Sequence, residues 1–187
     1  KVEVLNRYRS ITGKKIIPFY TSELEGFDIN YPEDLIYSKF SIEIPRDELI
    51  NEGREFLKNI FSERLNYMNG FEKLYSSLRP DYKLALVTST GPELVNHIDK
   101  ILDIFNKFDL VINSSDTILH KPNPEPYLLA INTFRISSNE AIVIEDSIQG
   151  IKAGKKAGCT VIALEGSLEK KYLNEADYII SSFYDLN

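Results

Sequence analysis

Short apolar runs alternate with helical segments through the second part of the chain, from about residue 70 onward. The apolar runs are residues 83–89, 109–114, 141–145, 160–164 and 177–181, and helical segments cover residues 71–78, 92–105, 124–134 and 148–158. This alternation is typical of β-α-β units, whose parallel strands share one sheet. The runs are continuously apolar, as strands covered by helices on both faces are. We therefore predict an α/β fold with a Rossmann-like, three-layer parallel-sheet core.

The first part of the chain has helical periodicity instead. Predicted helices cover residues 2–12, 32–42 and 45–61, and the last two begin with a proline, which suits a first helical turn. We expect a small α-helical domain over residues 1–66 and the α/β core domain over residues 67–187.

Charge and composition exclude several classes of protein. The 187 residues include 28 acidic and 22 basic side chains, a net charge of -6, so we expect no nucleic-acid partner, which would need a basic surface. No apolar run approaches the roughly 20 residues of a membrane span, and residues 1–20 lack the apolar core of a signal peptide. The single cysteine, Cys159, permits no intrachain disulfide. We expect a cytoplasmic protein without a membrane partner, as a monomer or weak homodimer.

Polar residues gather where three of the predicted strands end. In open parallel sheets, ligands bind at the carboxyl ends of the strands. The residues there are Thr88, Ser89 and Thr90 after the first strand, Lys121 in the loop after the second, and Glu145, Asp146 and Ser147 at the end of the third. Singly, each has a structural explanation, because hydroxyls and acids cap helices and a loop lysine is usually solvated.

The combination favours phosphate chemistry. Two adjacent carboxylates suit a hard cation such as Mg²⁺, which also takes ligands from substrate phosphates. A lysine and hydroxyls beside a helix start suit a phosphate group. Together these groups are typical of a phosphoryl-transfer site, where catalysis is mostly positioning and charge neutralisation.

Three stretches resemble motifs of the haloacid dehalogenase (HAD) superfamily, in its β-phosphoglucomutase-like and phosphoglycolate-phosphatase-like branch. They are "LALVTST", "HKPNPEPYLLA" and "IVIEDSIQGIKAGKKAG", and the resemblance extends from about residue 70 to residue 187. It implies that Thr88, Ser89 and Lys121 bind the transferring phosphoryl group, with Thr88 and Lys121 catalytic. It also implies that Asp146 binds Mg²⁺, with Glu145 as a direct or water-mediated ligand, and that residues 1–66 form a helical cap.

The activity that the resemblance implies is Mg²⁺-dependent hydrolysis of a small phosphorylated metabolite through an aspartyl-phosphate intermediate. A sugar phosphomutase on the same scaffold is the first alternative. A dehalogenase is disfavoured, because a site for an organic halide gains nothing from the bare carboxylates of Glu145 and Asp146. A non-catalytic protein of the same fold is the remaining alternative.

One part of the family pattern does not occur in the sequence. The family's first motif is an apolar strand that ends in D-x-D, with the nucleophile and the general acid/base, and none of the 187 residues forms a D-x-D. The nearest imitation, "FDINY" at residues 27–31, does not follow an apolar strand. The resemblance implies that this strand lies between residues 83–89 and 141–145 in the sheet, and that the motif lies roughly 10 to 20 residues upstream of Lys1. Without such a strand, both of its neighbours would keep unpaired buried backbone groups. The 187 residues alone are then expected to be inactive.

Overall fold

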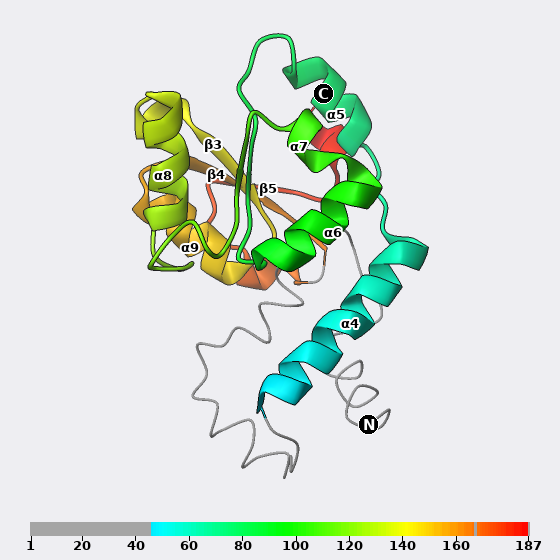
Figure 1. The fold of residues 1–187 in the computed structure, drawn as a ribbon. Helices are drawn as coiled ribbons and strands as arrows, with labels where there is room; N and C mark the ends of the chain where they lie inside the picture. Colours follow the sequence, from blue (N-terminus) through cyan, green and yellow to red (C-terminus); the bar gives the residue numbers. More distant parts are fainter. Residues whose placement is uncertain (1–45, 167, 187) are drawn as a thin grey trace.

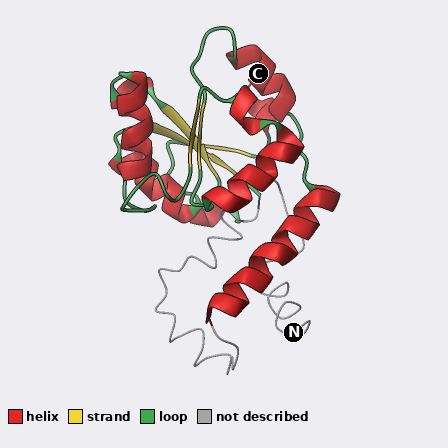
Figure 2. Cartoon of the chain, in the orientation of Figure 1, coloured by secondary structure: helices red, strands yellow, loops and turns green. Residues whose placement is uncertain are grey.

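The computed structural model describes residues 46–166 and 168–186, in which helices lie on both sides of parallel strands (Figures 1 and 2). The predicted α/β class and the three layers are confirmed. The predicted helices at residues 2–12 and 32–42 lie outside the described residues, as does most of the expected cap. None of the described helices is both long and apolar enough to cross a lipid bilayer.

The described elements follow the predicted order. The helices are α4 (Arg46–Arg64), α5 (Phe71–Leu78), α6 (Pro92–Leu102), α7 (Ile104–Lys107), α8 (Glu125–Phe134) and α9 (Ile148–Lys156), with short 3₁₀ helices η1 (Ser138–Glu140), η2 (Lys170–Tyr172) and η3 (Phe183–Leu186). The strands are β1 (Ala85–Val87), β2 (Leu110–Ile112), β3 (Ile142–Glu145), β4 (Thr160–Leu164) and β5 (Tyr178–Ile180).

The predicted segment 92–105 is two helices rather than one. Asp103 separates α6 from α7 because its backbone is left-handed, at φ 55° and ψ 46°. Aspartate is one of the few residues other than glycine that adopt this conformation readily. Periodicity alone does not reveal such a break, because apolar spacing continues across it.

The strands of the described residues form two parallel sheets. In one, β1 pairs with β2, with Leu86 opposite Val111. In the other, the order is β3-β4-β5, with Ile144 opposite Ile162. The described residues contain no pairing between β1 and β3, which are the two strands expected to flank a further strand.

Two apolar clusters cover opposite faces of the three-stranded sheet. On one face, residues of α8 and α9 such as Ile131, Ile151 and Ala153 pack on Val143 and Val161. On the other face, Leu74 of α5 and Phe183 of η3 pack on Leu164. The second face of β3 is not covered in the same way, since Ile142 and Ile144 are 62% and 36% exposed. This differs from the prediction of strands buried on both faces.

Helix α4 packs along α6 of the core (Figure 1). Phe61 and Leu65 form a buried cluster with Leu94. The segment that follows α4 is tied down as well, because the Tyr67 hydroxyl donates a 2.7 Å hydrogen bond to the carbonyl of Leu102 and its ring stacks on Phe71. The end of the expected cap is therefore in close contact with the core.

The two-stranded sheet begins at a charged anchor, Asp109. Its carboxylate accepts hydrogen bonds from the Leu84 N–H (2.9 Å), from Arg79 (2.9 Å) and from Lys83 (3.2 Å). The N–H of Leu84 and these two cations outweigh partial burial and hold the pKa of Asp109 below its ordinary value. The anchor thus fixes the start of β1 relative to β2.

We expect Asp109→Asn to lower the free energy of unfolding by about 1–2 kcal/mol at pH 7, because charge-assisted hydrogen bonds weaken. The pKa of Asp109 is lower in the folded protein than in the unfolded chain, where it is about 3.9. The ionised carboxylate therefore stabilises the fold above about pH 3.9, and this stability is lost as the pH falls through the folded-state pKa. The difference from wild type in urea titrations should therefore shrink in acid. Exposed Asp81 provides the control, Asp81→Asn. A penalty that persists unchanged in acid would contradict the assignment.

Candidate active site

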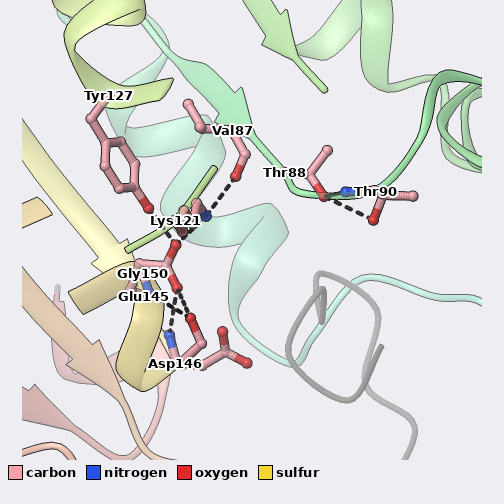
Figure 3. A network of polar contacts seen from close by, with 9 residues as sticks. Val87, Thr88, Thr90, Lys121, Tyr127, Glu145, Asp146 and Gly150 are labelled. Carbon is pink, nitrogen blue, oxygen red and sulfur yellow. Dashed lines mark hydrogen bonds and ion pairs between the residues drawn. The ribbon is translucent and has the colours of Figure 1, made fainter. Parts of the chain in front are cut away.

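The predicted site residues lie at the carboxyl ends of β1 and β3 (Figure 3). Thr88 follows the last residue of β1, and Glu145 is the last residue of β3. Lys121 comes from the loop between β2 and α8. The structure therefore brings Lys121 and Glu145 into contact although they are far apart in the sequence.

Lys121 bridges the two sheets. Its ammonium donates a 3.1 Å hydrogen bond to the carbonyl of Val87, the last residue of β1, and a 2.5 Å hydrogen bond to Oε1 of Glu145. The side chains of Lys121 and Glu145 are only 2% and 6% exposed. A buried pair of this kind is strongly destabilised when one partner is removed, because the other charge is left without compensation.

The loop that carries Lys121 is held in place by the start of α8. The carboxylate of Glu125, the first residue of that helix, accepts 2.9 Å hydrogen bonds from the N–H groups of Ile118 and Leu119. The loop continues through Asn123, whose side-chain oxygen accepts from the Glu125 N–H. Lys121 therefore projects from a braced segment.

Glu145 accepts four hydrogen bonds. The Tyr127 hydroxyl and Lys121 donate to Oε1, while the Ser147 hydroxyl (3.0 Å) and the Asp146 N–H (3.3 Å) donate to Oε2. Burial alone would raise the pKa of Glu145, but the Lys121 ammonium and the hydroxyls of Tyr127 and Ser147 outweigh burial and lower that pKa. Glu145 is therefore held as a carboxylate.

Asp146 has a different orientation from Glu145. Figure 3 shows its carboxylate turned away from the Lys121 ammonium, and the residue is 9% exposed. The two neighbouring acids thus point into different surroundings, as adjacent residues at a strand end do. Among residues 46–166 and 168–186, no three or more His, Cys, Asp or Glu residues cluster closely enough to hold a metal ion. The acid pair supplies oxygen ligands of the kind that Mg²⁺ prefers, but only part of a coordination shell.

The first turn of α9 leaves room for the Glu145 carboxylate. The Ser147 hydroxyl caps the helix by accepting from the Gly150 N–H at 2.9 Å. A Cβ atom on Gly150 would lie 2.1–2.3 Å from the carboxylate atoms of Glu145. Only glycine at this position is compatible with the carboxylate as it is placed.

Thr88 lies on the same rim, beyond Val87 (Figure 3). Its hydroxyl donates to the Thr90 hydroxyl (2.9 Å) and accepts from the Thr90 N–H (3.1 Å). Helix α6 begins directly afterwards, with Gly91 as an N-cap that makes no side-chain hydrogen bond. Free N–H groups at a helix start attract anions. The rim therefore joins a hydroxyl, a helix start and a buried cation.

Sequence reasoning missed Tyr127 as a site residue and gave Gly150 only a supporting role, in the loop and helix start that follow Asp146. They lie inside the motifs "HKPNPEPYLLA" and "IVIEDSIQGIKAGKKAG", respectively. A usable signal exists for Tyr127, because a buried tyrosine hydroxyl usually requires a hydrogen-bond partner. The close approach at Gly150 depends on tertiary geometry that spacing does not reveal.

We expect Gly150→Ala to destabilise the protein by about 1–3 kcal/mol, as overpacking does, although alanine normally favours a helix over glycine. Gly53 in α4 is the matched control, because a Cβ there meets no atom within 4 Å. Gly53→Ala should raise the free energy of unfolding by up to about 1 kcal/mol. Urea titrations measure both, and equal stabilisation by the two alanines would refute the close contact with Glu145.

Comparisons with known proteins agree with the motifs. The profile of the family described as "Haloacid dehalogenase-like hydrolase" matches residues 11–164. The pyrophosphatase PpaX of Bacillus mycoides is 26% identical over 196 residues, which span 99% of this chain and 84% of that protein. The phosphoglycolate phosphatase of Salmonella paratyphi A is 35% identical over 106 residues, 55% of this chain and 42% of the relative.

Solved structures share the fold. A crystal structure of a candidate β-phosphoglucomutase from Thermotoga maritima is 27% identical and superposes with a TM-score of 0.73, covering 100% of this chain and 88% of that one. The profile match covers most of the chain. The chain belongs to the haloacid dehalogenase-like hydrolase family.

Proposed function

We propose that the protein is a Mg²⁺-dependent phosphoric monoester hydrolase that acts on a small phosphorylated metabolite through an aspartyl-phosphate intermediate. The observation that carries the proposal is the buried Lys121–Glu145 pair at the ends of β1 and β3, beside Asp146. A relative named phosphoglycolate phosphatase supports the hydrolysis of a phosphate monoester. A relative named pyrophosphatase supports the more general reaction, transfer of a phosphoryl group to water.

Lys121 and Thr88 act on the phosphoryl group in this proposal. The Lys121 ammonium neutralises negative charge on the phosphoryl oxygens, and its buried position strengthens that interaction. The Thr88 hydroxyl and the Ser89 N–H donate hydrogen bonds to the same oxygens. The Thr88 hydroxyl, which donates to Thr90 in the structure, turns its proton to the phosphoryl oxygen when substrate binds. The Lys121 ammonium is held before substrate arrives, so its contribution requires little reorganisation.

Asp146 is the proposed carboxylate ligand of Mg²⁺. Its side chain is turned away from Lys121 (Figure 3), whereas both oxygens of Glu145 already accept hydrogen bonds. Glu145 is therefore placed to contribute through a water molecule more readily than directly. When bound, Mg²⁺ supplies charge neutralisation and orientation of the phosphate.

The nucleophile belongs, in this proposal, to a strand that lies between β1 and β3. These strands carry no pairing with each other in the described residues. No D-x-D occurs in the 187 residues. A strand that ends in D-x-D in this place would bring its first carboxylate to the Lys121 ammonium.

The proposed position of the nucleophile is tested by comparing two proteins, the 187-residue chain and a chain extended by the residues encoded before Lys1. We expect the 187-residue chain to hydrolyse no phosphate ester and the extended chain to do so, because only the latter supplies the nucleophile. A folded 187-residue chain that forms an acid-stable phosphoenzyme would contradict the placement. An extended chain that lacks D-x-D would favour the non-catalytic alternative.

A sugar phosphomutase is the second candidate, favoured by the likeness to the Thermotoga maritima structure. Activity should therefore be assayed with pyrophosphate, phosphoglycolate, glycerol 1-phosphate and β-glucose 1-phosphate. The first three compounds are taken from the names of relatives. A phosphatase releases inorganic phosphate from the best substrate, whereas a mutase returns the phosphoryl group to the sugar. Phosphate release and ³¹P NMR separate the two.

Substitution of the charged residues tests their assigned roles in the extended, active protein. Lys121→Met and Asp146→Asn should each lower kcat/KM by at least about 100-fold, as loss of a preorganised electrostatic group does, and a chelator should abolish activity. Exposed Lys171 offers the control, Lys171→Met, with unchanged kinetics. Full Mg²⁺-dependent activity in Asp146→Asn would refute the metal assignment.

A further inference from the structure

Tyr127 contacts both members of the buried ion pair. Its hydroxyl donates to Oε1 of Glu145, the same oxygen that accepts from Lys121. Its ring lies 5.1 Å from the Lys121 ammonium, within the range of a cation–π contact. The residue is 7% exposed, so the hydroxyl has no access to bulk water in exchange for this bond.

We propose that Tyr127 is a positioning residue, which fixes the Glu145 carboxylate and through it the Lys121 ammonium. The hydroxyl restricts rotation of the carboxylate about its last bond, and the ring closes one side of the space around the ammonium. Lys121 has a long flexible chain, so without these restrictions its ammonium samples several positions.

A fixed position of the Lys121 ammonium matters for the proposed phosphatase activity. The kinetic part of the inference therefore rests on the proposed function. A lysine that stabilises a phosphoryl group contributes most when its position is set before the reaction. Displacement by about 1 Å of a catalytic group can cost on the order of 100-fold in rate. Tyr127 touches no phosphoryl oxygen in this account and acts only through Glu145 and Lys121.

Two substitutions separate the hydroxyl from the ring. Tyr127→Phe keeps the ring and deletes the hydroxyl, whereas Tyr127→Leu deletes both. In the extended, active protein we expect Tyr127→Phe to lower kcat about 10- to 100-fold, the range for a hydrogen bond to a charged group, with KM unchanged. Tyr127→Leu should lower kcat further. Unchanged kcat in Tyr127→Phe, with loss only in Tyr127→Leu, would show that Tyr127 serves packing alone and would overturn the proposal.

Lysine acetylation measured by mass spectrometry provides a readout that is independent of phosphatase activity. Lys121 is 2% exposed and Lys83 is 70% exposed, so Lys121 should react far more slowly than Lys83 in the wild type. In Tyr127→Phe we expect the Lys121 to Lys83 rate ratio to rise about tenfold, the equivalent of one lost hydrogen bond. An unchanged or lower ratio would contradict the positioning role. This outcome can be read even if the wild type hydrolyses none of the esters, so the test does not depend on the proposed function.

Tyr67→Phe is the matched control. It also removes a tyrosine hydroxyl, here a partly buried one, which donates to the carbonyl of Leu102 at a distance from the site. We expect a lower midpoint of urea unfolding, with unchanged kcat and an unchanged Lys121 to Lys83 ratio. The same loss of kcat in Tyr67→Phe would attribute the effect of Tyr127→Phe to general destabilisation and would overturn the proposal.

Discussion

The buried contact between Lys121 and Glu145 is the interaction on which the rest of the site depends. Two charges in an apolar interior are stable only when both are fully compensated. Glu145 is compensated by four donors and Lys121 by the carboxylate, the Val87 carbonyl and the Tyr127 ring. Because these partners come from the ends of β1 and β3 and from α8, the ion pair holds those elements at one rim.

The same contact explains several local features of the sequence. Glycine is needed at residue 150 because the Glu145 carboxylate lies against the first turn of α9. Ser147 both caps that helix and donates to Glu145. Glu125 braces the loop that presents Lys121. Helix capping, loop conformation and site electrostatics thus use the same few residues, so a single substitution is expected to affect stability and activity together.

Much of this architecture could be predicted from sequence. The βαβ order and the polar strand ends followed from continuous apolar runs, and "HKPNPEPYLLA" with "IVIEDSIQGIKAGKKAG" indicated the family. The break at Asp103 was missed because it depends on one backbone conformation. The saturation of Glu145 and the role of Tyr127 were missed because they depend on which side chains meet across the fold. The exposed face of β3 was missed because apolar composition does not show what covers a strand.

The division between the two sheets connects the fold to the proposed chemistry. The ends of β1 and β3 are joined by a side chain, Lys121, in a place where parallel strands are otherwise joined by backbone pairing.

A crystal structure of the extended protein with Mg²⁺ and a beryllium fluoride mimic of phosphate tests this account most directly. We expect a strand between β1 and β3, a carboxylate bound to the mimic, and the Lys121 ammonium within hydrogen-bond distance of the mimic. A mimic bound away from Lys121, or β1 paired directly with β3, would contradict the account.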